Sequence, residues 1–285
     1  MALLIIFIFG LFIGSFLNVL ILRCNTGFSI VSGRSKCRDC NNNLKWYELI
    51  PVLSFLSQKG RCRKCGTKIS IQYPIVEILT ALIFGFAYLK ITGFFEYGFF
   101  YLNSFSPAAA GLMFSRISIF PSGAKEIFFL TSAFIFFSIL IVISAYDYYH
   151  KIIPNLYSFF LFVFSIVFVS IFSLFFYDLK FFLQNVLSGI GFFSFFFFFS
   201  FVSGEKWMGY GDSKLAASLG LFLGPIKTLM ALMFSFWIGA IFGILVLFLT
   251  RKISLKSQVP FAPFLALGAF MAFLIEIDFI YLLLV

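Results

Sequence analysis

The chain has 285 residues, of which 62% are hydrophobic and only 11% are charged, and its mean hydropathy is +1.07. Soluble domains carry about 25% charged residues, so this composition excludes an ordinary soluble protein. It predicts a chain that lies largely in a lipid bilayer. Phenylalanine accounts for 48 residues, and we interpret runs such as 192–201 as lipid-facing surface.

The net charge of +10 is concentrated near the N-terminus. Segment 23–73 holds ten Lys or Arg residues and two acidic residues, so it contributes ten minus two, or eight, of the net charges. On a soluble protein this pattern would suggest nucleic-acid binding. Beside transmembrane helices the positive-inside rule explains it better, as a cytoplasmic loop near anionic lipid. We therefore expect the lipid bilayer as a partner, and no nucleic acid.

The distribution of apolar residues predicts an all-α polytopic membrane protein with about eight transmembrane helices, since one span needs about 20 apolar residues. The expected helices cover residues 2–22, 74–92, 126–146, 155–177, 181–202, 212–223, 226–249 and 263–284. The first lacks a basic n-region and a small-residue cleavage site, so we expect it to be retained. Segment 93–125 is expected outside, partly in the interface.

The two strongest basic loops predict the orientation. Counting helices from an outside N-terminus places loops 23–73 and 251–258 in the cytoplasm, as the positive-inside rule requires. The same count places Asp147 and the segment 209–212 on the cytoplasmic side.

The basic loop between the first two helices contains two CxxC pairs. These are Cys37 with Cys40 and Cys62 with Cys65, and 21 residues separate the pairs. Two such pairs supply four thiolates to a tetrahedral zinc ion, and the neighbouring Arg and Lys side chains favour the thiolates. Disulfides or free thiols are the alternative, although cytoplasmic placement argues against disulfides. Four protein ligands leave no position for water, so we expect structural zinc.

Two aspartates at predicted helix ends point to catalysis. Asp147 is expected to close helix 126–146, and Asp212 follows Gly209 and Gly211 in a GxGD string that opens helix 212–223. An ionisable residue at a membrane boundary is a functional-site hypothesis, and two carboxylates brought together by packing can activate water, as in aspartic proteases. The glycines would allow a tight turn and close approach of a substrate strand.

A purely structural interpretation of the aspartates is also available. Each could cap a helix or pair with a lysine such as Lys151 or Lys214. His150, the single histidine of the chain, is interpreted as a solvated turn residue, because an aspartate pair needs no histidine.

Several strings, in order along nearly the whole chain, resemble the bacterial type IV prepilin peptidases, a family of GxGD aspartic peptidases. The strings are residues 14–19, 48–54, 60–62, 73–77, Asp147 with 153–155, 209–215 and 260–266. One departure is visible: Arg23 is followed by Cys24 and Asn25, where the family often has Leu-Pro.

The resemblance implies a bifunctional, multi-pass enzyme of the bacterial cytoplasmic (inner) membrane whose active site faces the cytoplasm. It would remove the leader of type IV prepilins or type II secretion pseudopilins after a glycine. It would then methylate the new N-terminal amine, with S-adenosylmethionine as donor. Asp147 and Asp212 match the peptidase pair. Methyl transfer is tied to the N-terminal region and to Gly60, with Glu77 and Asn18 as further candidates.

The implied domain organisation has three parts. Residues 1–92, with zinc loop 23–73, would be the methyltransferase region, 93–125 an external connection, and 126–285 the aspartic peptidase domain. Two rival interpretations exist. A presenilin-type intramembrane protease would explain neither the zinc loop nor the string 153–155. A zinc-stabilised scaffold or transporter part would keep its function after both aspartates were neutralised.

Overall fold

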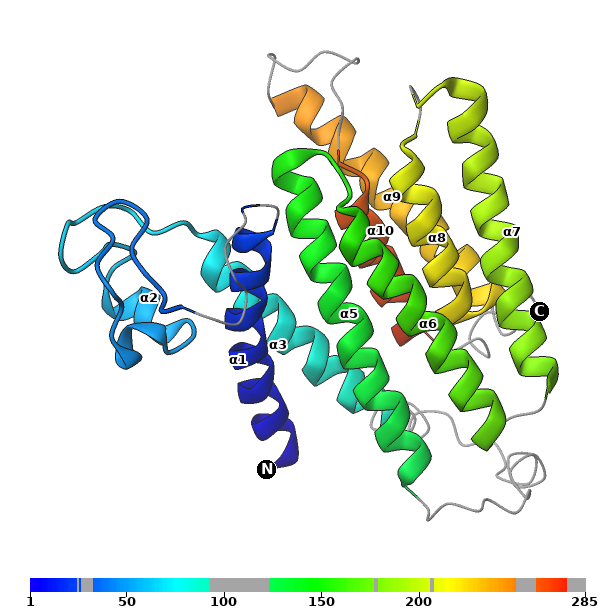
Figure 1. Ribbon diagram of the computed structural model, residues 1–285, viewed down its shortest axis with the longest axis horizontal. Helices are drawn as coiled ribbons and strands as arrows, with labels where there is room; N and C mark the ends of the chain where they lie inside the picture. The colour runs from blue at the N-terminus through cyan, green and yellow to red at the C-terminus, as the bar shows by residue number, and fades with distance from the viewer. Residues whose placement is uncertain are drawn as a thin grey trace. The chain divides into compact units, whose positions relative to one another are not determined.

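The computed structural model describes residues 1–24, 26, 33–92, 123–176, 179–205, 208–249 and 260–275. Over these residues the chain is helical apart from loops and two isolated β-bridges (Figure 1). The prediction of an all-α protein is therefore confirmed. The chain divides into two compact units, residues 1–89 and 90–285.

The first unit is built on two membrane-length helices, α1 (Ala2–Arg23) and α3 (Gln72–Ile91). Small residues let their backbones meet. A Cβ on Gly10 would lie 2.6 Å from Cα of Ala81, and a Cβ on Gly14 would lie 2.6 Å from Cα of Glu77. Glycines spaced by four residues are a recurrent way for membrane helices to approach closely.

The loop between α1 and α3 contains two short helices, η1 (Trp46–Leu49) and α2 (Leu53–Ser57). It also contains the two β-bridges, Lys36 with Asn43 and Arg61 with Lys68. The sequence predicted the loop but none of these local structures.

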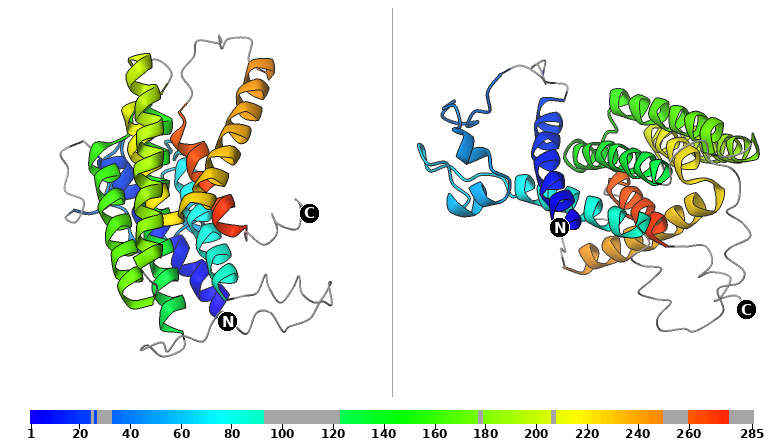
Figure 2. Two further views of the ribbon diagram at one scale, coloured as in Figure 1. Left: turned by 90° about the vertical axis from the view of Figure 1, so that its right-hand side faces the viewer. Right: turned by 90° about the horizontal axis from the view of Figure 1, so that it is seen from below.

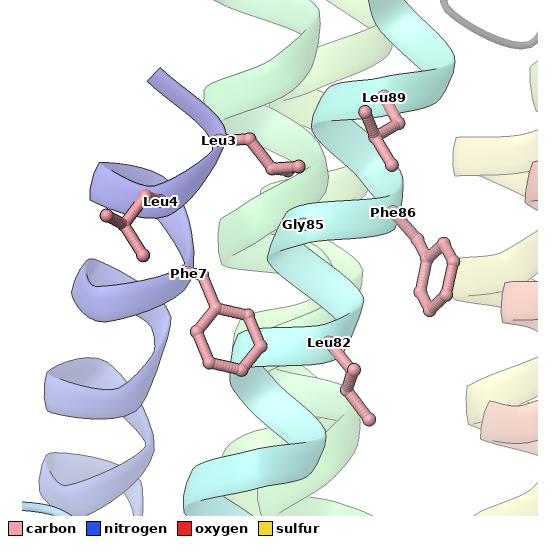
Figure 3. Close-up of a pocket in the computed structure, with 7 residues that line it drawn as sticks. All are labelled: Leu3, Leu4, Phe7, Leu82, Gly85, Phe86 and Leu89. Atoms are coloured by element: carbon pink, nitrogen blue, oxygen red, sulfur yellow. The ribbon is translucent and has the colours of Figure 1, made fainter. Parts of the chain in front are cut away.

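An apolar groove of about 310 Å³ lies between the start of α1 and the end of α3 (Figure 3). Its lining residues are Leu3, Leu4, Phe7, Leu82, Gly85, Phe86 and Leu89. All seven are apolar or glycine, so the groove suits hydrocarbon and offers no group for catalysis.

The second unit contains six helices within its described residues. They are α5 (Ala124–His150), α6 (Asn155–Phe176), α7 (Leu179–Ser203), α8 (Tyr210–Leu223), α9 (Pro225–Leu249) and α10 (Ala262–Leu274). Helix α8 packs on α6 and α7, and α10 packs on α5 and α9 (Figure 2). The turn between α5 and α6 lies beside the connection from α7 to α8. Residues that follow α5 therefore come close to the start of α8, although they are distant from it in sequence.

Phenylalanine side chains fill much of the core of this unit. The rings of Phe136 and Phe222 are stacked with centroids 4.0 Å apart, and Phe168 lies 4.7 Å from Phe222. All three rings are buried. By contrast, most of the run 192–201 is exposed on α7, as expected for a lipid-facing surface.

Six of the described helices are long and apolar enough to cross a membrane: α1, α3, α5, α6, α7 and α9. The other two predicted spans correspond to α8, with 14 residues, and to α10, with 13 described residues. The chain is thus a multi-pass membrane protein. The basic loop 251–258 and nearly all of the expected external segment 93–125 lie outside the described residues.

Candidate functional site

Asp147 lies inside the last turn of α5, which continues to His150. The sequence prediction that this helix ends at residue 146 was therefore wrong by about one turn. The ring of Tyr146 packs on that of His150, one turn later, with centroids 4.3 Å apart. Lys151 then adopts a left-handed conformation (φ 55°, ψ 32°) and its N–H donates to the carbonyl of Asp147. His150 is thus an exposed helix-end residue rather than a turn residue.

The carboxylate of Asp147 is held by the beginning of α10. Its side chain is only 5% exposed, and Oδ2 accepts a hydrogen bond of 3.1 Å from the N–H of Ala262. The hydroxyl of Ser144 donates to the carbonyl of Ala262 at 3.2 Å. Free backbone N–H groups at a helix start attract negative charge. The sequence analysis used segment 260–266 only as part of the family resemblance and did not predict that it binds the carboxylate of Asp147.

Asp212 is the third residue of α8, not its first as predicted. It is 9% exposed, and Oδ2 accepts a hydrogen bond of 3.3 Å from the N–H of Gly209, the residue that caps the helix. The side chain of Asp212 therefore contributes to capping α8 by accepting the N–H of the N-cap residue, as the purely structural interpretation of the aspartates anticipated. Gly209 itself has φ −77° and ψ 153°, a conformation open to any residue, so the expected tight turn does not explain this glycine.

The segment after α5 packs directly on the GxGD string. A Cβ on Gly211 would lie 2.7 Å from Cβ of Ile153, so only glycine allows this approach. One turn further, the amine of Lys214 donates to Oδ1 of Asn155 at 2.8 Å. These contacts give a physical role to the strings 153–155 and 209–215.

The structure brings Asp147 and Asp212 close enough for their charges to interact. The two carboxyl groups belong to the ends of α5 and α8, and both are nearly buried. Helix capping alone does not require burial, since side chains at exposed helix ends also cap helices. Two neighbouring carboxyl groups can act together on one water molecule when one is ionised and serves as the base while the other is protonated and serves as the acid.

The four cysteines predicted to bind metal also come together. Their Sγ atoms all lie within 4.8 Å of one another, and those of Cys37 and Cys65 are 3.8 Å apart. A tetrahedral zinc site with Zn–S bonds of about 2.3 Å has edges of about 3.8 Å. All four thiols are free rather than paired in disulfides. The donor set thus fits a tetrahedral metal ion.

Each CxxC pair sits in the same kind of turn. The N–H of Cys37 donates to the carbonyl of Asn42, and that of Cys62 donates to the carbonyl of Thr67, both at 2.9 Å. Four residues after each first cysteine the backbone has positive φ, 53° at Asn41 and 74° at Gly66. Two similar turns that present two sulfurs each are the usual construction of a four-cysteine site.

One thiol of the cluster is prepared to ionise. Hydrogen bonds from the hydroxyl and the backbone of Thr67 lower the pKa of Cys65 to about 6. The Sγ to Oγ1 distance is 3.2 Å. Because the thiolate is the form that binds metal, Cys65 is the readiest ligand of the four. At Cys40, by contrast, burial and the neighbouring thiols raise the pKa to about 11, so this thiol would have to give up its proton when a metal ion binds.

The candidates for methyl transfer lie in the first unit. Glu77 is 6% exposed and Oε2 accepts a 2.7 Å hydrogen bond from the N–H of Val52. The amide of Asn18 donates to the carbonyls of Gly14 (3.2 Å) and Tyr73 (3.1 Å), and its buried Oδ1 has no partner among the described residues. The sequence analysis gave Val52 no role of its own, although it lies in the string 48–54 that carries the resemblance.

A multi-pass helical protein with a buried pair of aspartates at helix ends has the features expected of a membrane aspartic peptidase. Family comparison gives the particular group. Residues 8–91 match the bacterial peptidase A24 N-terminal domain, and residues 134–244 match the type IV leader peptidase family.

Three relatives, each named prepilin leader peptidase/N-methyltransferase, support this. The Bacillus subtilis protein is 33% identical over 271 residues, 95% of this chain and 93% of the relative. The Myxococcus xanthus protein is 52% identical over 88 residues, 31% of this chain and 26% of the relative. The Pseudomonas aeruginosa protein is 27% identical over 288 residues, covering 93% and 87%. No solved structure matches the chain. The chain belongs to the type IV leader peptidase family, which the resemblance predicted.

Proposed function

We propose that this protein cleaves the leader from type IV prepilins or pseudopilins and then methylates the new N-terminal amine with S-adenosylmethionine. The observation that carries the proposal is the meeting of Asp147 and Asp212, buried and interacting, in a chain of this family. The names of the relatives support both activities.

In the cleavage step, the two aspartates act together on one water molecule. One carboxylate takes a proton from water while the other, protonated, donates to the carbonyl oxygen of the scissile bond. The resulting tetrahedral intermediate collapses with breakage of the C–N bond and proton transfer to the leaving amine. The hydrogen bonds from Ala262 and Gly209 hold the two carboxyl groups in fixed orientations.

Methyl transfer is assigned to residues 1–92, with Gly60, Glu77 and Asn18 as candidate residues. S-adenosylmethionine is the second substrate and provides the methyl group. The acceptor amine must be neutral to attack it, and an N-terminal amine has a pKa of about 8. Methylation should therefore slow as the pH falls below that value.

The four cysteines would hold a structural zinc ion. Zinc would join the turn at Cys37 and Cys40 to the turn at Cys62 and Cys65, and so fix the loop between α1 and α3. With all four positions taken by sulfur, the ion has no open site for a substrate.

We further propose that the protein lies in the bacterial cytoplasmic membrane with loop 23–73 and both aspartates on the cytoplasmic side. The excess of basic residues in that loop supports this orientation.

Mass spectrometry of a prepilin co-expressed with this chain tests the proposal. We expect wild-type membranes to yield mature pilin that lacks the leader and carries one methyl group, and Asp212→Ala membranes to yield intact prepilin. Mature pilin without the methyl group would limit the function to peptidase activity. Failure to cleave any of several different prepilins would contradict the proposal.

A further inference from the structure

The backbone at Val52 has an unusual conformation. Val52 has φ 59° and ψ −51°, a region that side chains branched at Cβ seldom adopt. The N–H of Leu53 donates to the carbonyl of Pro51 at 2.5 Å, across Val52. This closes a γ-turn with positive φ, a rare and strained turn. Such strain persists where surrounding contacts enforce it, commonly at functional sites.

Glu77 supplies the contact that enforces this turn. Its Oε2 accepts the N–H of Val52 at 2.7 Å, which ties α3 to the start of α2. Gly14 packs against the Cα of Glu77, which leaves the carboxylate in a narrow space between α1 and α3. A carboxylate buried in a membrane helix is costly, so packing alone does not explain it.

The Val52 turn in turn determines where Gly60 lies. Helix α2 begins immediately after Val52, and its Phe55 ring is 3.1 Å from where a Cβ of Gly60 would be. The N–H of Gly60 donates to the carbonyl of Phe55 at 2.9 Å, and the carbonyl of Gly60 accepts the N–H of Ile69 at 2.7 Å. Gly60 has φ 64°, a backbone conformation that glycine adopts readily and other residues seldom do.

We infer that Glu77 is a positioning residue for methyl transfer: it holds the strained turn at Val52 and thereby fixes α2 and Gly60 relative to α1 and α3. This inference rests on the proposed methyltransferase function. In this role Glu77 acts through the Val52 turn and not on the substrate. Glu77 and its hydrogen-bond partner Val52 belong to the first unit, whereas Asp147 and Asp212 belong to the second, so peptidase activity should not depend on the turn.

The test uses the full chain in membranes with a co-expressed prepilin, and scores leader removal and methylation separately. Glu77→Gln keeps a carbonyl oxygen that can accept the Val52 N–H, so methylation should stay within about threefold of wild type. Glu77→Leu removes the acceptor at similar size, so methylation should fall by about tenfold or more. Leader removal should change by less than about twofold in both variants.

The decisive control is Val52→Gly. Glycine adopts positive φ without strain, so the turn no longer depends on Glu77. In the Glu77→Leu background, Val52→Gly should restore methylation by about fivefold. A direct chemical role for Glu77 would not be rescued in this way, and failure of the rescue would overturn the inference. Should Glu77→Leu not accumulate in membranes, Glu77→Ala, which also lacks the acceptor for the Val52 N–H, carries the same test with and without Val52→Gly.

The outcomes separate the two proposals. Wild-type enzyme that cleaves but never methylates would overturn the methyltransferase function together with this inference. Wild-type enzyme that methylates, with Glu77→Leu methylating equally well, would overturn the inference alone.

Discussion

Ile153, in the turn between α5 and α6, packs on the backbone of Gly211 in α8, so closely that a Cβ on Gly211 would lie 2.7 Å from Cβ of Ile153. Gly211 is one residue from Asp212, and Ile153 follows the α5 turn that holds Asp147. The contact therefore sets the distance between the helix ends that carry the two carboxylates.

Gly211→Ala should separate these elements and reduce leader removal by about a hundredfold, the cost of a displacement near 1 Å at a catalytic site. Leader removal is measured with a co-expressed prepilin. Ile153→Gly in the same chain should recover part of the activity, because it removes the clashing Cβ. Gly191→Ala is the matched control, since nothing lies within 4 Å of a Cβ at that position on α7. Equal activity of Gly211→Ala and Gly191→Ala would contradict the prediction.

Asp147→Ala and Asp212→Ala should each lower leader removal by about 10⁴-fold, because residues that act as one catalytic unit lose nearly everything when either is removed. Thermal unfolding in detergent should show that both variants remain folded. Glu126→Gln provides the control: it neutralises an exposed carboxylate in the first turn of the same helix as Asp147 and should be fully active. Substantial cleavage by either alanine variant would refute the assignment of the pair.

Lys214 and Asn155 should be coupled in stability. Their hydrogen bond of 2.8 Å joins α8 to the first residue of α6, and we expect Lys214→Met and Asn155→Leu each to cost up to about 1 kcal/mol. The double variant should lose little more than one single variant, a result that thermal unfolding can measure. Lys180→Met, at an exposed position of α7, controls for loss of charge. Additive losses would show that the two side chains do not interact.

Purified protein should contain one zinc ion per chain by atomic emission. Cys65→Ser should lose the zinc, because three sulfurs hold the ion far less tightly than four. Cys24→Ser should keep it, since Cys24 is not among the four clustered cysteines. Chelation should make the loop between α1 and α3 sensitive to proteases that cut after basic residues. A full zinc content in Cys65→Ser would argue against the four-sulfur site.

The sequence was informative where chemistry depends on residue type and spacing. Apolar runs predicted the helices, and the two CxxC pairs predicted a cluster whose sulfurs do lie together. The GxGD string singled out Asp212. Each of these signals is local, so it can be recognised along the chain without knowledge of the packing.

What the sequence did not predict depends on contacts between distant segments. Nothing in the residues around Ala262 indicates that its N–H binds Asp147, and nothing at Val52 indicates positive φ. A smaller miss was local: helix α5 continues to His150, whose ring packs on Tyr146 one turn earlier, and ends at the left-handed cap at Lys151. Helix propensity alone does not contain that information.

The length of α8 has a consequence for the depth of the site. Its 14 residues span about 21 Å, less than the roughly 30 Å of a bilayer's hydrocarbon. A helix this short with one end at the surface has its other end within the lipid, where backbone groups must find partners in the protein. Such partners gather at the Gly224 end: Thr228 donates to the carbonyl of Leu219 at 3.0 Å, and the buried Asn185 lies beside Gly224.

The opposite end of α8 carries Asp212 and the exposed Lys214. We therefore expect this end to be the one at the bilayer surface, within reach of bulk water. Under the proposed function, hydrolysis at this end would use water that need not cross the hydrocarbon. The proposed function then requires no unwinding of the substrate's apolar helix within the bilayer, since the bond to be cut would lie just outside it.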